Sequence, residues 1–415
     1  MIKLSDRAVD LLLYSLSAIF ALVTALTSTL LPHRAWGAIA ACGYLAAALL
    51  VFLVRQRGLL TWVAWGAVAL LPMIVQAVQR ASGRTDRAQE EVLVVEHMGE
   101  SLLHSGTPYL SRPEIAAIPL DERLLGYRPY QPGMSIFGLP RALAGEHWWT
   151  DARIWFAIIT VAAVGAAVTL LRRPDPSAVR PARAFPSFIP EHPTLVRAMQ
   201  AATVLPVTAL TLATGGDDIP VLALCLLALA LASAGRPGWS GVAAGAAAAC
   251  KLFALPVVAV LVVHAVATGT WRRLLPGALG LPMLALLPPL LVDVDALVEN
   301  VLRFPLGHGL VTSPAQSPFP GYLIAQTVPG GRSVAAGLLV AAALVIGVLL
   351  LRRPPRTARS AALFCGWGLF TAILLMPTTR FGYLLYPAAL LLFAPALSKH
   401  TASSAPRHDT ALYRQ

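Results

Sequence analysis

The chain has 415 residues, of which 57% are hydrophobic and 13% are charged, and its mean hydropathy is +0.69. A soluble protein of this length carries about twice that charged fraction, and apolar stretches of about twenty residues, each long enough to cross a bilayer, recur along the chain. The formal net charge of +12 comes from single and paired basic residues between these stretches, so it indicates a membrane topology and not a nucleic-acid-binding surface.

Hydropathy predicts membrane-crossing helices along most of the chain. Residues 239–270 are too many for one ordinary span, and the proline of KLFALP (251–256) breaks or kinks a helix. We therefore expect two shorter segments that meet near Lys251. The sequence predicts an all-α fold, a polytopic transmembrane helical bundle of about 11–12 spans. The other expected spans are 11–31, 36–54, 59–78, 152–171, 196–214, 219–234, 274–292, 333–351, 358–376 and 381–396.

Polar stretches divide this bundle into parts. Three transmembrane helices are expected over 1–78 and an outer-face polar loop with short helices over 79–150. A bundle of about eight or nine spans is expected over 151–397, followed by a disordered cytoplasmic tail over 398–415. The prolines of the arginine-rich linker 172–186 exclude a long helix there.

The basic residues predict the orientation. If the N-terminus is cytoplasmic, the cytoplasmic turns collect most of the arginines, including Arg55, Arg172 and Arg352, and the short outer turns hold little more than Arg34 and Arg380. Most of the acidic residues then lie outside. We expect a multi-pass plasma-membrane protein with both termini in the cytoplasm, and its arginine-rich, lysine-poor composition favours a bacterial source.

The polar segment at 79–150 is the clearest candidate for a functional region. It holds nine of the twenty acidic residues and two compact turns, SGTPY (105–109) and YRPYQPG (127–133). The outer histidines, such as His97 and His104, show no metal-ligand spacing, so we predict no metal site. The spans are expected to hold this loop over a site at the outer face.

Three more polar features are predicted to reach the same face. They are Asp217 and Asp218 in TGGDDIP (214–220), Lys251 at the broken helix, and Arg380 in TTRFGYLLYP (378–387). Ionisable groups at membrane depth are costly, so they usually mark function or a satisfied pair. Each also has a purely structural interpretation: Asp217 can cap a helix, Lys251 can extend to the interface, and Arg380 can close a helix end.

The sequence contains no nucleotide-binding signature. The pattern G-x-x-x-x-G-K-[ST] is absent, and no soluble stretch is long enough for a dinucleotide-binding domain. A group donor used at the outer face then has to be membrane-borne or extracellular.

The order of these motifs resembles glycosyltransferase family 87, within superfamily C. The family pattern is an acidic residue soon after a span, a short helix, a P-Y turn and a Y-x-P-G-type start of the next helix. EEVLVVEHMGESLLHSGTPY (90–109) and YRPYQPGMSIFGLP (127–140) are similar to it, with glutamates where the family usually has aspartate. Residues 215–256 and 378–387 resemble its later elements, and the likeness covers most of 90–395 in order.

The resemblance implies transfer of one sugar, a mannose-like hexose favoured, from a polyprenyl-phosphate donor to a lipid or glycan acceptor at the outer face. Glu91 is implied as the catalytic base, with Glu96 as second choice, since a carboxylate has to deprotonate the acceptor hydroxyl. Lys251 and Arg380 would hold the phosphate. Grooves between the spans would take the polyprenyl chain among membrane lipids, and no cofactor or metal is required. The other substrate-binding positions are Asp217, Asp218, Tyr109 and Tyr130.

Two other classes of function remain open at this point. A twelve-span transporter fits the span count, but the two halves show no repeat and few ionisable residues lie mid-membrane to relay a proton. A non-catalytic membrane scaffold needs the same helices but no particular carboxylate. A transporter accumulates substrate, and a scaffold tolerates the loss of Glu91, Lys251 and Arg380.

Overall fold

The computed structural model describes residues 5–172, 189–190 and 192–398 of the chain. Over these residues the protein is helical, and the one β-type pairing among them is an isolated bridge between Gln316 and Thr379. The all-α prediction is therefore confirmed.

Seven of the described helices are long and apolar enough to cross a membrane. The third of them runs through α3, a π-helical turn and α4 without a break. The prediction of a polytopic membrane protein is confirmed. The seven are α1 (Asp6–Thr27), α2 (Leu31–Leu53), α3–α4 (Arg57–Ala81), α8 (Ala152–Leu171), α14 (Trp271–Val292), α17 (Gly331–Arg352) and α18 (Ala358–Leu375).

Shorter apolar helices occupy the remaining predicted spans. α9 and α10 together pass the same test of length and composition but are bent by 41°. The total of 11–12 crossings stays a prediction, because these helices are short for a bilayer. They are α9 (Pro193–Thr203), α10 (Pro206–Thr214), α11 (Asp218–Ser233), α12 (Pro237–Cys250), α13 (Leu255–Ala267) and α19 (Leu385–Leu397).

The predicted break at Lys251 is present between α12 and α13. Lys251 has an extended backbone (φ −154°, ψ 140°), and Pro256 in the first turn of α13 lacks the N–H that a continuous helix would need there. Small residues let α12 pack tightly on α14, since a Cβ at Gly245 would lie 2.0 Å from the carbonyl oxygen of Gly277. Because α12 packs closely on α14 and ends at Cys250, the backbone of Lys251 is fixed, and so is the point from which its side chain extends.

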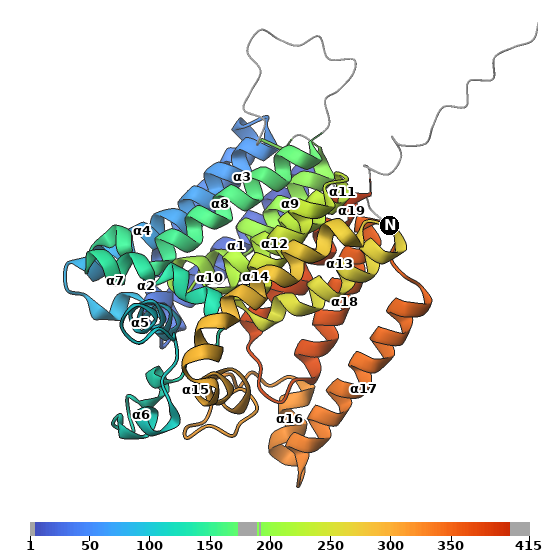
Figure 1. Cartoon of the computed structure of the whole chain (residues 1–415). Helices are drawn as coiled ribbons and strands as arrows, with labels where there is room; N and C mark the ends of the chain where they lie inside the picture. Colours follow the sequence, from blue (N-terminus) through green and yellow to red (C-terminus); the bar gives the residue numbers. More distant parts are fainter. Residues whose placement is uncertain (1–4, 173–188, 191, 399–415) are drawn as a thin grey trace, which may run out of the picture.

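Short helices form a polar lobe at one end of the bundle (Figure 1). Two segments build it, the stretch after α4 and the stretch after α14. The short helices predicted for 79–150 are therefore present, although the domain boundaries as such stay a prediction. The lobe contains α5 (Glu90–Ser105), α6 (Arg112–Ala117), α7 (Leu139–Ala144), α15 (Val294–Val298) and α16 (Pro320–Thr327).

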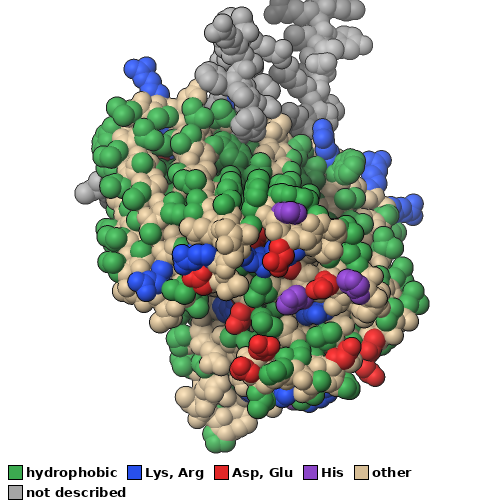
Figure 2. Space-filling model, turned by 90° about the vertical axis from the view of Figure 1, so that its left-hand side faces the viewer, with side chains coloured by type: hydrophobic (Ala, Val, Ile, Leu, Met, Phe, Trp, Pro, Cys, Tyr) green, Lys and Arg blue, Asp and Glu red, His purple; other side chains and the backbone are tan. Residues whose placement is uncertain are grey.

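Hydrophobic side chains cover the outside of the bundle. Figure 2 shows one face on which they spread over the upper part, while acidic and histidine side chains gather over the lower part and basic side chains lie both there and at the upper edges. Large apolar residues on α1, α2, α14 and α17 are widely exposed, among them Leu26 at 71% and Leu291 at 82%. Such a surface is stable against lipid and not against water.

A buried ion cluster ties three helices together at the end away from the lobe. Asp10 on α1 is 2.5 Å from Arg57 Nε and 2.5 Å from Arg197 Nη1. This end was predicted to be cytoplasmic, and the orientation stays a prediction. The linker 172–186 and the tail 398–415 were predicted too, but beyond Arg172 and Ser398 they lie outside the described residues.

Candidate active site

A cavity of about 690 Å³ lies where the lobe meets the bundle. Segments far apart in the sequence bring titratable side chains to one end of it, which we call the polar end. Six of the eight residues predicted for the site line the cavity or belong to this end. The polar end comprises Glu90, Glu91, Asp217, Asp218, Lys251 and Arg380, with Tyr130 beside them.

Lys251 joins the two aspartates at the polar end. Its Nζ lies 2.6 Å from Asp217 Oδ2 and 2.6 Å from Asp218 Oδ1. The hydroxyl of Tyr386 donates a 2.8 Å hydrogen bond to Asp218 Oδ1, and the ring centroid of Tyr130 is 5.2 Å from the ammonium. The lysine is buried and paired, so its side chain does not extend to the membrane interface.

The backbone of the turn before α11 turns both aspartates towards Lys251. Gly216 has φ +86°, a conformation that favours glycine, and a Cβ there would lie 2.8 Å from the Phe156 ring. Asp217 makes no side-chain capping hydrogen bond to α11. Its carboxylate binds the lysine, and the purely structural interpretation of Asp217 as a helix cap does not apply.

Arg380 closes the other side of the polar end. It immediately precedes a 3-10 turn (Phe381–Leu384), and its Nη1 contacts Glu91 Oε1. Glu91 lies in the first turn of α5, where a carboxylate also interacts favourably with the helix dipole. Each of the two cations of the polar end therefore contacts at least one carboxylate.

Glu90 is the carboxylate of the polar end with no ion pair among the described contacts. Although much of its side chain is exposed, its carboxyl is partly withdrawn from water at the cavity. This desolvation, and then the negative charge of Glu91, raise the pKa of Glu90, while Arg380 opposes the shift. Glu90 therefore stays protonated to a higher pH than an ordinary glutamate.

The cavity continues into an apolar region between the spans. Side chains of α1, α10 and α19 line this region, and Phe20 on α1 is 46% exposed at the outer surface of the bundle. The cavity thus joins a charged end to an apolar end that reaches the lipid-facing side. The apolar lining includes Phe20, Val207, Leu210, Leu384 and Ala388.

The described residues contain no cluster of three or more histidine, cysteine, aspartate or glutamate side chains that could hold a metal ion. Three of the four carboxylates of the polar end are divided between Lys251 and Arg380 instead of converging on one point.

The sequence model of glycosyltransferase family 87 matches residues 129–377, more than half of the chain. The chain belongs to glycosyltransferase family 87. The match includes Tyr130, Asp217, Asp218 and Lys251, whereas Glu91 lies 38 residues before it and Arg380 three residues after it. The cavity brings these two flanking residues to the matched ones.

Two solved structures are similar to this family 87 chain. One is ArnT from Cupriavidus metallidurans bound to undecaprenyl phosphate (18% identity, TM-score 0.48), covering 83% of this chain and 60% of ArnT. The other is the same protein in the apo state (20% identity, TM-score 0.45), covering 81% and 59%. The chain thus spans about three fifths of the length of ArnT. A comparison with curated protein sequences found no match.

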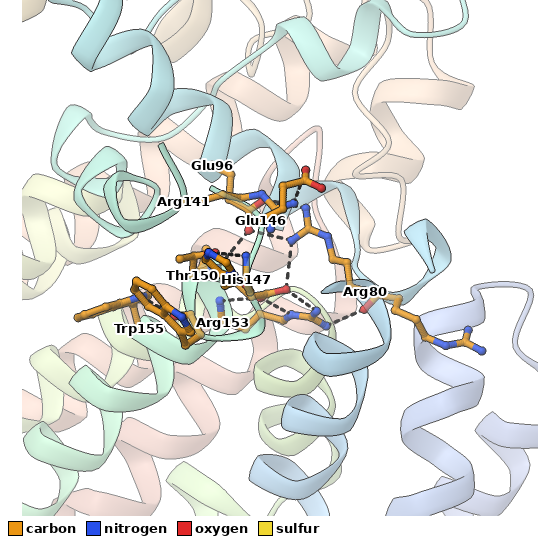
Figure 3. A network of polar contacts seen from close by, with 12 residues as sticks. Arg80, Glu96, Arg141, Glu146, His147, Thr150, Arg153 and Trp155 are labelled. Atoms are coloured by element: carbon orange, nitrogen blue, oxygen red, sulfur yellow. Dashed lines mark hydrogen bonds and ion pairs between the residues drawn. The ribbon is translucent and has the colours of Figure 1, made fainter. Parts of the chain in front are cut away.

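Glu96, the second choice for a base in this family 87 chain, lies outside the cavity. It is buried and takes two hydrogen bonds from Arg80, at 2.8 and 2.7 Å. Arg141 Nε lies 3.2 Å from the same carboxylate, and the amide of Ala152 donates to it at 3.2 Å. Figure 3 shows Glu96 among these arginines. The contacts fix α5 against α4 and α8.

Tyr109, one of the eight predicted residues, lies behind the cavity wall. Its hydroxyl donates a 2.8 Å hydrogen bond to the carbonyl of Tyr130, which lines the cavity. Burial raises the pKa of Tyr109 above its ordinary value. Tyr109 therefore supports the position of Tyr130 and does not reach the cavity itself.

Sequence reasoning missed several side chains of the polar end. Tyr383 and Tyr386 lie near Lys251, and His33 and Gln89 also line the cavity or flank its residues. The two tyrosines follow Arg380 three residues apart in RFGYLLYP, a spacing that predicts one shared face of a helix. Tyr383 lies in the 3-10 turn and Tyr386 in α19. Nothing in the sequence marked His33, on α2 in the N-terminal part of the chain.

Proposed function

We propose that this chain transfers a sugar from a polyprenyl-phosphate donor to a hydroxyl of a lipid or glycan acceptor at the outer face of the membrane. One observation carries the proposal: a single cavity joins carboxylates and cations to an apolar region that reaches the lipid-facing side of the bundle. A donor that carries both a charged phosphate and an apolar lipid chain needs a site with both of these regions. The family resemblance favours a mannose-like hexose as the sugar.

Lys251 and Arg380 would hold the donor phosphate. Both are cations at the polar end, and their charge-assisted hydrogen bonds would stabilise the charge that develops on the leaving phosphate. Glu91 and the two aspartates form ion pairs with these cations. Phosphate oxygens would replace part of these carboxylate contacts.

Glu91 would act as the base, in preference to Glu96. Glu91 borders the cavity, and Glu96 is committed to Arg80 outside it. The acceptor oxygen forms the new bond to the anomeric carbon while the bond from that carbon to the phosphate oxygen breaks. The hydroxyl proton passes to Glu91, and polyprenyl phosphate leaves with the electron pair.

Asp217, Asp218 and Tyr130 would orient the sugar. The two aspartates present oxygens that accept hydrogen bonds from sugar hydroxyls, and Tyr130 provides a ring next to them. Tyr109 would act indirectly, through its hydrogen bond to Tyr130.

The apolar region of the cavity would take the first isoprene units of the donor. Its residues come from α1, α10 and α19, so the chain would pass between these helices into the bilayer. We place the protein in a bacterial plasma membrane with the lobe outside and both termini cytoplasmic, because the basic residues favour that orientation.

The test is sugar transfer in membranes that contain this chain, supplied in turn with labelled polyprenyl-phosphate mannose, arabinose and glucose. A labelled lipid or glycan from one donor, absent in membranes without the protein, is the expected result. No product with any donor, in membranes where the protein is abundant and a crude lipid and glycan extract supplies acceptors, would contradict the proposal.

A further inference from the structure

A buried arginine outside the cavity contacts both segments that carry the carboxylates of the polar end. Arg153 lies in the first turn of α8 and is fully buried. It belongs through Asp151 to the same polar network as Arg80, Glu96 and Arg141, and Figure 3 shows these side chains close to one another. Neither the motifs nor the resemblance drew attention to it.

Asp151 fixes the guanidinium of Arg153. Arg153 Nε and Nη2 donate to the two carboxylate oxygens at 2.9 and 2.8 Å, and the backbone amide of Arg153 donates to the same carboxylate at 3.1 Å. Arg80 Nη1 adds a bond to Asp151 at 3.1 Å. The fork geometry leaves one nitrogen of Arg153, Nη1, free to point elsewhere.

That nitrogen joins two stretches of backbone. Arg153 Nη1 donates to the carbonyl of Arg87 at 2.8 Å and to the carbonyl of Ala213 at 3.1 Å. Arg87 lies three residues before Glu90, and Ala213 lies four residues before Asp217. One guanidinium therefore holds the start of α5 next to the end of α10.

Two further hydrogen bonds join the same two stretches and fix their relative position. The amide of Gln89 donates to the carbonyl of Thr214 at 3.0 Å, and the Thr214 hydroxyl donates to Gln89 Oε1 at 2.7 Å. Both residues line the cavity. The relative position of these two stretches, which Arg153 supports, therefore determines the distance between the Glu91 carboxylate and Asp217.

We propose that Arg153 is a positioning residue for glycosyl transfer, which sets the separation between the base on α5 and the sugar-binding aspartates at the start of α11. This proposal rests on the proposed function. A lysine would keep the positive charge but has no planar fork, so it cannot hold Asp151 with two parallel bonds and still reach both carbonyls. The base and the bound sugar would then both remain in the site but would be misaligned.

The test compares Arg153→Lys with Arg141→Lys in the full chain, purified in lipid nanodiscs. Arg141 is the matched control, because it binds Glu96 and Glu146 in the same network but, unlike Arg153, makes no described contact to the backbone before Glu90 or before Asp217. Three quantities are measured: the kcat of transfer per folded protein, the KM for the donor, and amide hydrogen exchange in the peptide that contains Gln89.

Arg153→Lys is expected to lower kcat by about tenfold or more at a donor KM close to wild type, because small misplacements of reacting groups are costly. Exchange at Gln89 should become faster, since its bond to Thr214 weakens. Arg141→Lys should leave all three quantities at wild-type values. If Arg153→Lys does not fold, Asp151→Asn provides the second variant, since it loosens the fork while Arg153 remains.

Wild-type kcat in Arg153→Lys would overturn the positioning role, whether or not exchange changes. An equal loss of kcat in both variants would overturn it too, since a general loosening of the network would then explain the result. The proposed function fails in a different way: the wild-type protein would transfer no sugar, while Arg153→Lys would still accelerate exchange at Gln89.

Discussion

Arg380 contacts the carboxylate of Glu91 across a separation of 289 residues in sequence. The contact joins the first turn of α5 in the lobe to the turn before the last helix of the bundle. It also pairs the proposed base with a proposed phosphate ligand. Binding of a donor phosphate to Arg380 would release Glu91, so the base would become active when the donor is in place.

Replacement of Glu91 by Gln should separate these two roles. Transfer should fall by about 10² to 10⁴-fold, because the acceptor hydroxyl loses its base. Polyprenyl phosphate should bind as tightly as to the wild type or more tightly, since Arg380 no longer has a carboxylate partner. Product formation and equilibrium binding of undecaprenyl phosphate measure the two effects.

Glu100→Gln is the matched control for that experiment, because Glu100 lies on the same helix but does not line the cavity. It should behave as wild type in both assays. Near-normal transfer by Glu91→Gln would show that Glu91 is not the base. If undecaprenyl phosphate binding weakened as much as transfer, Glu91 would instead be a ligand of the donor.

Glu96→Gln should affect stability and not chemistry. The substitution leaves Arg80 in a buried network without one of its two carboxylate partners, and breaking a buried ion pair costs about 3 kcal/mol. We expect a lower Tm by thermal unfolding in detergent, with transfer per folded molecule close to wild type. A stable Glu96→Gln protein with little transfer would instead restore Glu96 as a candidate base.

The positions of the spans and the convergence of Asp217, Lys251 and Arg380 were predictable from the sequence. The length of each apolar stretch predicts where the chain crosses the membrane. Successive crossings then place the connecting turns alternately on the two sides. The break at Lys251 followed from a stretch too long for one span and from its proline. These inferences depend on local properties of the chain.

The choice between Glu91 and Glu96 was not predictable in the same way. Five residues apart on a helix, they point about 140° away from one another, so both cannot face one cavity. Which of them does depends on where α5 packs. Arg80 and Arg153 decide that through contacts between distant segments, which no local pattern reveals.

Donor binding should weaken as the pH rises through the pKa of Glu90. That pKa lies above the ordinary value for glutamate, so the carboxyl is neutral on the acidic side of it and charged on the basic side. Ionisation adds a negative charge near Arg380, which opposes an anionic phosphate. The Kd for undecaprenyl phosphate should therefore increase across this range, and Glu90→Gln should remove the step. A Glu90→Gln protein with the wild-type pH profile would contradict this role.

Removal of the Lys251 charge should lower both the stability of the protein and its donor binding, and a second substitution separates the two effects. Lys251→Met leaves Asp217 and Asp218 buried without their cation, so it should destabilise the protein by about 3 kcal/mol and abolish donor binding. The double variant Lys251→Met with Asp217→Asn removes one of the uncompensated charges. It should recover much of the Tm while donor binding stays absent; recovery of binding as well would exclude Lys251 as a phosphate ligand.

A larger side chain in the apolar region should discriminate donors by the length of their lipid. Leu210 on α10 lines this region, so Leu210→Trp should raise the KM for an undecaprenyl-phosphate sugar by about tenfold and change the KM for a short-chain analogue little. Leu290→Trp, on the exposed surface of α14, is the matched control and should change neither. The ratio of the two KM values is the measurement, because it cancels general effects of the substitution on activity. An unchanged ratio in Leu210→Trp would mean that the polyprenyl chain leaves the polar end by another path.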